Sequence, residues 1–209
     1  KPLLICLDRD GTINQDPGYL GRDHLWRSQL KIYEDAVQAL KILRERLQRE
    51  SYKIIVATNQ SGIAQSYFNC ERGEEGNRTI DEILKDNGIE IDSWHYCPFI
   101  TKEEAEQRKV SIDNPWVKET NLRKPGIGML EQAANSFGKT LEDFSVYFIG
   151  DKLDDVLTGI NAKGKGILIK RRDNQYYDEE KWKKLRVQYR QEVYKFNSMI
   201  KAIGKILLR

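Results

Sequence analysis

Residues 3–12 decide the fold of this chain, and they read Leu3-Leu4-Ile5-Cys6-Leu7-Asp8-Arg9-Asp10-Gly11-Thr12. The five apolar residues predict a strand that is buried on both faces, since such strands lose the alternation of polar and apolar side chains. Two carboxylates follow, at the end of the strand where open α/β sheets bind their ligands. Buried carboxylates are costly unless they are paired or take part in chemistry. Taken alone, the motif also fits a capped turn, so its meaning depends on the rest of the chain.

The length and composition of the chain are those of one α/β domain with an insertion, and we expect a single domain over residues 1–209. A net charge of +3 gives no overall attraction to nucleic acid, so nucleic-acid binding is not expected. No apolar run approaches the roughly 18 residues of a membrane span, and no signal peptide is visible. The three cysteines are scattered and odd in number, as in a reducing compartment. We therefore expect a cytoplasmic protein without membrane contact, and a monomer.

Apolar periodicity predicts alternating strands and helices along the rest of the chain. Further strands are expected at Tyr52–Ala57, Ser93–Cys97, Ser145–Ile149 and Gly166–Lys170. Helices are expected over about 34–49 and 69–87, around Lys102–Lys109, after Pro125-Gly126 and around Val156–Ile160. A last helix is expected at the end of the chain, because Val193, Phe196, Ile200, Ile203 and Leu207 share one face. Residues 98–122 are charged and irregular, and they form the insertion. Strands that alternate with helices predict a parallel sheet with right-handed crossovers.

Polar clusters follow several of the expected strands. They are Asp8 with Asp10, Thr58 with Asn59, and Asp151 with Asp154 and Asp155, while the pair Arg123-Lys124 precedes a helix. The carboxyl ends of parallel strands meet at one edge of the sheet, so these side chains are expected to lie together. Carboxylate oxygens are the ligands that Mg²⁺ prefers, while Lys, Arg and a helix N-terminus attract phosphate. The combination predicts a phosphoryl-transfer site.

Such a site needs several kinds of group to cleave a phosphate ester. Mg²⁺ and Lys124 neutralise the charge of the phosphate, which otherwise repels nucleophiles. One of the two aspartates attacks phosphorus and forms an aspartyl-phosphate. The other protonates the leaving alkoxide and then deprotonates the hydrolytic water.

These motifs, in this order, resemble those of the haloacid-dehalogenase-like (HAD) phosphatases. The resemblance rests on Asp8-Arg9-Asp10-Gly11-Thr12, Thr58-Asn59, Lys124, and Gly150-Asp151 with Asp155. It implies a Rossmann-like three-layer α/β sandwich with a central parallel sheet and minimal cap loops, Mg²⁺ as cofactor, and the two-step aspartyl mechanism. By the same resemblance Asp8 is the nucleophile, Asp10 is the acid/base, and the metal ligands are Asp8, the backbone carbonyl of Asp10, and Asp151. Asp155 is expected beside these ligands rather than on the ion, and the phosphate-binding positions are Gly11, Thr12, Thr58, Asn59 and Lys124.

The similarity extends to one branch of this family, which contains the D-glycero-D-manno-heptose 1,7-bisphosphate phosphatases and the histidinol-phosphate phosphatases. It is carried by Leu7–Asn14, Asp16–Tyr19, Thr58–Ala64, Tyr96–Pro98, Arg123–Pro125 and Gly150–Leu153. The resemblance implies substrate contacts from Asp16, Pro17, Gly18, Tyr19, Gln60, Ser61, Arg123 and Lys152. Arg123 suits a second phosphate because its planar fork binds oxyanions through two hydrogen bonds, and the alternative is a surface cation at a helix start.

One motif of that branch is incomplete in this chain. Members of the branch hold a structural Zn²⁺ through Cys-x-His after the third strand and Cys-x-Cys before Arg-Lys-Pro. Here Cys97 is present, but the other positions are taken by Phe99, Thr120 and Leu122. One thiolate does not make a tetrahedral zinc site, so no structural Zn²⁺ is expected. Residues 98–122 are expected either to be held by packing through Trp116 and Pro115 or to be mobile.

The function expected from the sequence is a Mg²⁺-dependent phosphatase of a small phosphorylated metabolite, with a sugar bisphosphate of the heptose type as substrate. Histidinol phosphate is an alternative substrate on the same scaffold. A nucleic-acid 3′-end phosphatase is a second alternative, since residues 163–190 are rich in Lys and Arg, although such a stretch also fits a solvated helix face. A degenerate scaffold without catalysis is the non-enzyme alternative, and the filled catalytic positions argue against it.

Overall fold

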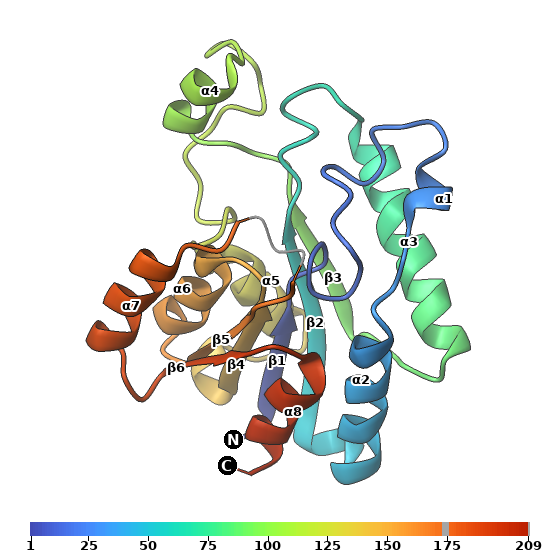
Figure 1. Cartoon of the computed structure of the whole chain (residues 1–209), viewed down its shortest axis with the longest axis vertical. Coiled ribbons are helices and arrows are strands. Elements are labelled where there is room, and N and C mark those ends of the chain that lie inside the picture. The colour runs from blue at the N-terminus through green and yellow to red at the C-terminus, as the bar shows by residue number, and fades with distance from the viewer. Residues whose placement is uncertain (173–175, 209) are drawn as a thin grey trace.

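The fold is built around one parallel sheet. The computed structural model describes residues 1–172 and 176–208, and within them the sheet has six strands in the order β3-β2-β1-β4-β5-β6 (Figure 1). The strands are β1 (Leu3–Leu7), β2 (Tyr52–Asn59), β3 (Ser93–Cys97), β4 (Ser145–Gly150), β5 (Lys165–Ile169) and β6 (Val193–Phe196). All neighbouring strands are parallel. The chain adds β2 and β3 on one side of β1 and the later strands on the other, so the strand order reverses beside β1.

Helices connect the strands and cover both faces of the sheet (Figure 1). In the described ranges the α-helices are α1 (Trp26–Gln29), α2 (Glu34–Arg46), α3 (Cys70–Asp86), α4 (Lys102–Arg108), α5 (Gly128–Ser136), α6 (Leu153–Asn161), α7 (Glu179–Gln188) and α8 (Met199–Leu207). Short 3-10 turns lie at Arg49–Ser51 and Leu141–Asp143.

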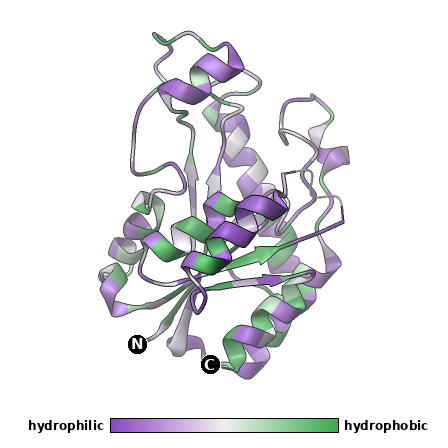
Figure 2. Ribbon diagram, turned by 60° about the vertical axis from the view of Figure 1, so that its left-hand side comes forward, coloured by the Kyte–Doolittle hydropathy of each residue, from purple (hydrophilic) through white to green (hydrophobic). Residues whose placement is uncertain are grey.

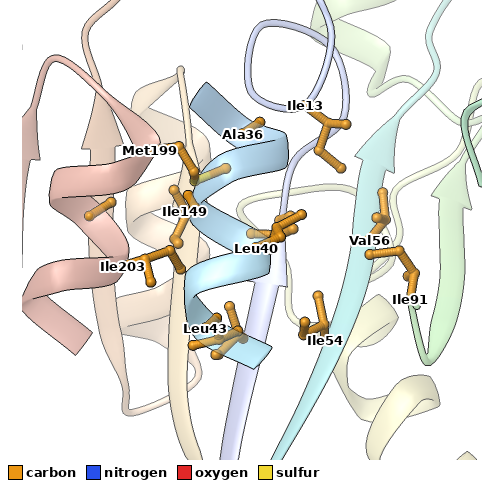
Figure 3. Packing of buried hydrophobic residues seen from close by; sticks show 14 of the residues in the cluster. Ile13, Ala36, Leu40, Leu43, Ile54, Val56, Ile91, Ile149, Met199 and Ile203 are labelled. Carbon is orange, nitrogen blue, oxygen red and sulfur yellow. The ribbon is translucent and has the colours of Figure 1, made fainter. Parts of the chain in front are cut away.

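The side chains of β1 alternate between two cores. Leu3, Ile5 and Leu7 belong to a core that includes residues of α2, α3 and α8. Leu4 and Cys6 belong to the core on the other face, which includes residues of α5. Figure 3 shows the first core, where side chains of α2 and α8 meet those of the strands. The predictions of a strand buried on both faces and of a three-layer α/β sandwich are confirmed.

A third, smaller core lies where α6 and α7 cover β5 and β6. It is formed by Val156, Leu168, Trp182 and Val193. Hydrophobic and hydrophilic residues both occur along the helices that cover the sheet, as expected for helices with one buried side (Figure 2). Among the described residues, no helix is both long and apolar enough to cross a membrane.

The end of the chain differs from the sequence prediction. The apolar spacing predicts one helix from Val193 to Leu207, and this prediction is wrong for its first part. Val193–Phe196 is strand β6, which pairs with β5 at the edge of the sheet. Helix α8 begins only at Met199, after Ser198, whose hydroxyl caps it. The spacing of such a short apolar run is compatible with a helix and with a strand. Here the run forms a strand, because β5 offers it an edge to pair with.

Other boundaries shift by a few residues. Helix α2 ends at Arg46, because Leu47 is already extended, so the expected helix is too long at its end. Strand β2 continues beyond Ala57, so that Thr58 and Asn59 lie in the strand itself and not after it. Both residues pair with β3, and the sheet therefore fixes the positions of two predicted site residues.

The insertion over residues 98–122 stands beyond the carboxyl ends of the strands and carries α4 (Figure 1). Packing holds it: the rings of Phe99 and Trp116 lie 5.6 Å apart between centroids. Ile100 and Ala105 form a small buried cluster with Ala64 of the main body. The expected packing through Trp116 is thus present, whereas Pro115, which was also expected to pack, is exposed.

Cys97, which directly precedes this insertion, is the one cysteine that remains of the zinc-binding motif. It is buried, and burial raises the pKa of its thiol, which contacts the carbonyl of Phe99 at 3.8 Å. In the described part of the chain, Cys97 belongs to no group of three or more side chains that could hold a metal. That no structural Zn²⁺ is bound stays a prediction.

Candidate active site

Asp8 and Asp151 follow neighbouring strands at the carboxyl edge of the sheet. Asp8 comes after β1 and Asp151 after β4, and these strands pair with Leu7 opposite Ile149. The backbone N–H of Asp8 donates to the carbonyl of Ile149 at 2.9 Å. Open α/β sheets bind ligands where the strand order reverses, which here is beside β1. A cavity of about 250 Å³ lies at this edge, with Asp8 in its wall.

The ammonium group of Lys124 bridges two buried carboxylates in the wall of the cavity. Its Nζ lies 2.7 Å from Asp8 Oδ1 and 2.6 Å from Asp155 Oδ1. All three residues are at most 4% exposed. Burial alone lowers the pKa of an amine, but Asp155 and Asp8 outweigh burial and raise the pKa of Lys124 above its ordinary value. Lys124 therefore remains charged at neutral pH.

Asp155 is engaged at both of its carboxylate oxygens. Oδ1 contacts Lys124, and Oδ2 accepts the backbone N–H of Lys152 at 2.9 Å, at the first turn of α6. Burial raises the pKa of Asp155 to about 6, with Lys124 opposing this shift and Asp8 adding to it. Both oxygens of Asp155 therefore have partners within the protein, and its position beside the metal ligands rather than on the ion stays a prediction.

Three buried carboxylates at this edge of the sheet lie close enough together to hold a metal ion. Asp8, Asp151 and Asp155 each offer one oxygen, and these oxygens lie within 4.8 Å of one another. Burial, followed by the charge of Asp8, raises the pKa of Asp151 to about 9. Burial is the largest cause of this shift, the negative charges of Asp8 and Asp155 add to it, and Lys152 and Lys124 only partly oppose it. Mg²⁺ prefers carboxylate oxygens and supplies the missing positive charge, so the donor set fits this ion.

The carboxylate of Asp10 is held by three surrounding side chains. Arg9 donates from Nε to Oδ1 at 3.1 Å and from Nη2 to Oδ2 at 2.8 Å. Asn14 donates to Oδ1 at 2.9 Å, and Gln60 donates to Oδ2 at 3.1 Å. Burial raises the pKa of Asp10, but these donors, led by the charge of Arg9, outweigh burial and hold the pKa below its ordinary value. Asp10 is therefore fixed in one orientation in its ionised form.

Arg9 is a site residue to which sequence reasoning gave no role. Its side chain is 1% exposed and donates to Asn77 of α3 at 2.7 Å and to Gln60 Oε1 at 3.1 Å, in addition to Asp10. A buried guanidinium with side-chain acceptors on several sides orients Asp10 and has little freedom to bind a ligand. The sequence does contain one signal for Arg9: it stands between two carboxylates close to the end of a buried strand, where an unpaired charge is costly.

The residues at the end of β2 reach the same cavity. Its walls include Thr58, Asn59, Gln60 and Ser61. The hydroxyl of Thr58 accepts from Gln60 Nε2 at 2.9 Å. The side chain of Asn59 brackets the backbone of Lys124, accepting from its N–H at 3.1 Å and donating to its carbonyl at 3.2 Å. Asn59 therefore positions Lys124.

Gly11 and Thr12 shape the turn after Asp10, and neither lines the cavity. Gly11 has a φ of 86°, and a Cβ at this position would lie 2.3 Å from Asp151 Oδ2, so only glycine fits. Arg171 donates to the carbonyls of Gly11 and Thr12 at 3.2 and 3.0 Å. This bracing arginine was not anticipated from the sequence. Phosphate contacts from Gly11 and Thr12 stay a prediction.

The expected substrate-side residues divide into two groups. Those that line the cavity are Asp16, Tyr19, Gln60, Ser61, Arg123 and Lys152. Pro17 and Gly18 do not line it, and the N–H of Gly18 donates to Asp16 Oδ1 at 2.8 Å within the loop. Lys152 Nζ lies 3.8 Å from Asp16 Oδ2. Glu104 and Arg108 of α4 also line the cavity, and sequence reasoning missed both because they belong to the irregular insertion.

Gly150 leaves the space that the carboxylate of Asp155 occupies. A Cβ on Gly150 would lie 2.1 Å from Asp155 Oδ2, which the N–H of Lys152 holds in place. We expect Gly150→Ala to displace Asp155 from Lys124 and to lower the free energy of unfolding by about 1–3 kcal/mol, as overpacking does. Thermal and denaturant unfolding measure this change.

Gly204→Ala in α8 is the matched control for that substitution. A Cβ on Gly204 meets no atom within 4 Å, so no contact is disturbed. Since Ala is favoured over Gly inside a helix by about 0.5–1 kcal/mol, this variant is expected to be slightly more stable than the wild type. A Gly150→Ala protein as stable as Gly204→Ala would contradict the close packing described for Asp155.

Comparisons with known proteins agree with this geometry. The family model described as "Polynucleotide kinase 3 phosphatase" matches residues 5–191. The chain is 32% identical over 165 residues to a D-glycero-beta-D-manno-heptose-1,7-bisphosphate 7-phosphatase of Pasteurella multocida, which covers 79% of this chain and 79% of that protein.

Solved structures show a similar fold. A candidate HAD-like phosphatase of Mesorhizobium loti superimposes with a TM-score of 0.65 and 27% identity, covering 81% of this chain and 74% of that one. The D,D-heptose 1,7-bisphosphate phosphatase of B. bronchiseptica, solved with magnesium and phosphate, superimposes with a TM-score of 0.68 at 21% identity, covering 99% and 98% of the two chains. The chain belongs to the HAD-like phosphatases, within the family that the polynucleotide kinase 3 phosphatase model describes.

Proposed function

We propose that this chain is a Mg²⁺-dependent phosphatase that acts through an aspartyl-phosphate on a sugar bisphosphate of the heptose type. The observation that carries the proposal is the buried cluster in which Lys124 Nζ lies 2.7 Å from Asp8, next to Asp151 and Asp155, at the edge of a cavity. The substrate class is supported by the name of the Pasteurella multocida relative.

In the first proposed step, a carboxylate oxygen of Asp8 attacks phosphorus. A bond between Asp8 and phosphorus forms as the ester P–O bond breaks, and the leaving alkoxide takes a proton from Asp10. Lys124, in contact with Asp8, attracts the anionic phosphate and reduces its repulsion of the nucleophile. Asp8 and Asp151 would hold Mg²⁺ through their side chains, with Asp155 beside them, and the ion would further neutralise the phosphate oxygens.

In the second proposed step, Asp10 takes a proton from water while the water oxygen attacks phosphorus. The bond between Asp8 and phosphorus breaks, which restores the Asp8 carboxylate and releases inorganic phosphate. Asp10, whose pKa lies below its ordinary value, is ionised at neutral pH and is therefore in the state that accepts this proton. A phosphate placed beside Asp10 raises its pKa by charge repulsion, which favours the protonated form needed in the first step.

A panel of phosphate esters tests the proposal. With Mg²⁺ present, we expect kcat/KM for D-glycero-D-manno-heptose 1,7-bisphosphate to exceed that for histidinol phosphate by at least about tenfold, which needs about 1.4 kcal/mol of selective binding. EDTA should abolish phosphate release, and excess Mg²⁺ should restore it. A preference for histidinol phosphate would favour the alternative substrate, and no release from any ester would refute the phosphatase assignment.

A nucleic-acid 3′-end phosphatase is the second candidate, favoured by the description of the matching family model. The basic stretch over 163–190 includes α7, while its residues 173–175 lie outside the described part of the chain. Lys181 and Lys183 of α7 lie 3.7 and 3.0 Å from Asp178 and Glu180, which suits a solvated helix face. Binding to 3′-phosphorylated DNA that weakens steeply with salt would favour this candidate over a sugar phosphatase.

A further inference from the structure

Arg108 lies in the wall of the cavity on the side of α4, and the mechanism above gives it no task. Asp8, at the end of β1, and Lys124, in the turn before α5, line the same cavity, and α4 stands beyond the carboxyl ends of the strands (Figure 1). A substrate whose reacting phosphate meets Asp8 therefore has its remaining part in reach of α4.

Helix α4 is held in one position relative to the main body. Thr101 and Glu104 cap its start reciprocally, with Glu104 N–H donating to Thr101 Oγ1 at 3.1 Å. Ala105 packs into the buried cluster with Ala64, and the side chain of Asn114 donates to the carbonyl of Ala64 at 2.9 Å. Arg108 thus projects from a fixed support and not from a free loop.

The guanidinium of Arg108 reaches across to the loop that follows β1. Its Nη1 donates to the hydroxyl of Tyr19 at 2.8 Å, and Gln65 donates to the same hydroxyl at 3.0 Å. Tyr19 has a φ of 86°, a left-handed conformation that costs energy outside glycine, and strained residues of this kind cluster at active sites and ligand clamps. The contact joins the insertion to the loop that carries Asp16, over the cavity.

Arg123 was the expected ligand of a second phosphate, but its donors are largely committed within the protein. Nε donates to Glu104 Oε2 at 2.6 Å, Nη2 contacts the other oxygen of Glu104, and Nη1 donates to the carbonyl of Phe99 at 2.9 Å. Its side chain is 11% exposed. Arg123 therefore braces Glu104 and the start of the insertion.

Arg108 is more exposed than Arg123, and its contact with Glu104 is looser. Its side chain is 30% exposed, and its contact with Glu104 is long, at 3.5 Å. Glu104 is the acid shared by both guanidinium groups, so two positive charges face one negative charge. The bidentate pair with Arg123 neutralises Glu104, and the charge of Arg108 remains to attract an anion.

We propose that Arg108 binds the second phosphate of a bisphosphorylated substrate, and that Glu104 and Arg123 position α4 for this contact. The proposal rests on the proposed function and deepens it, because it names the residue that distinguishes a bisphosphate from a monophosphate. Arg108 touches the part of the substrate that does not react, so it contributes uniform binding and acts on KM.

Arg108→Gln tests the proposal with a matched pair of substrates, heptose 1,7-bisphosphate and heptose 7-phosphate. We expect kcat/KM for the bisphosphate to fall about 10- to 100-fold, mainly through KM, and that for the monophosphate to change less than about twofold. Arg108→Lys should restore part of the loss. Equal losses on both substrates, or no loss on either, would overturn the proposal.

Lys102→Gln removes the same charge from an exposed position on the same helix, and it should leave both substrates unaffected. Calorimetric titration of heptose 1,7-bisphosphate into Asp8→Asn and into Asp8→Asn/Arg108→Gln measures the contact without turnover. The double variant should bind about 10- to 100-fold more weakly, and equal affinities would refute the role of Arg108. An inactive wild type whose titrations still differ would refute the proposed function and support the contact.

Discussion

Asp8→Asn is expected to lower phosphate release by at least about 10³-fold while the protein remains folded. The amide lacks the anionic oxygen that attacks phosphorus, and removing a nucleophile costs more than removing one general acid or base, which contributes about 10²- to 10⁴-fold. The fold should persist, because Lys124 keeps its 2.6 Å contact with Asp155 and the cluster loses one of its mutually repelling carboxylates. Steady-state phosphate release and a circular-dichroism melt measure the two effects.

Asp86→Asn is the control for that variant, since Asp86 is an exposed aspartate at the end of α3. It makes the same change of charge and should leave both activity and melting temperature at the wild-type values. Retained turnover in Asp8→Asn would refute the assignment of Asp8 as nucleophile. If turnover and the circular-dichroism signal of the folded protein are lost together, the loss of turnover results from unfolding and not from the missing nucleophile.

The positions of those site residues that follow strand ends could be predicted from the sequence. Asp8 and Asp151 each follow a run of apolar residues, and parallel strands bring their carboxyl ends to one edge. This expectation requires strands that are parallel and adjacent, and the sequence alone does not state their order. The structure adds that β1 and β4 are adjacent, so the two carboxylates lie close enough to share one cation.

Contacts between distant segments could not be predicted from periodicity. Arg9 meets Asn77 of α3 at 2.7 Å, and Arg108 meets Tyr19 at 2.8 Å, although 68 and 89 residues separate these partners along the chain. Apolar spacing shows which side of an element is buried, but it does not show which polar side chains meet between elements. The insertion is the extreme case, because Ile100 and Ala105 bury themselves against Ala64, a distant residue that apolar spacing does not indicate as their partner.

Asn59 shows how a residue can be located correctly and its contacts still be missed. The motif placed it at the end of β2, among residues expected to bind phosphate. In the structure both of its side-chain polar atoms contact the backbone of Lys124. Asn59 therefore positions Lys124, a role that depends on hydrogen-bond partners and that residue type alone does not give. Direct phosphate binding by Asn59 stays a prediction.

Lys124→Met is expected to have the largest effect on stability. The apolar side chain leaves Asp8 and Asp155 buried without their cation, and removing one partner of a buried ion pair costs about 3–5 kcal/mol. For a chain of this length that corresponds to a fall in melting temperature of roughly 6–20 °C. Turnover should also fall by about 10²- to 10³-fold, because a charge that stabilises the transition state is lost.

Mg²⁺ should oppose the loss of stability in Lys124→Met, and this dependence separates the electrostatic explanation from a packing defect. A cation held by Asp8 and Asp151 balances charge that Lys124 no longer balances, and any ligand that binds only the folded state raises its stability. Lys163→Met, which removes an exposed lysine paired with Glu142, should melt as the wild type does, with or without Mg²⁺. If Lys124→Met melts at the wild-type temperature, or if Mg²⁺ stabilises it no more than it stabilises Lys163→Met, the buried carboxylates do not carry the unbalanced charge inferred here.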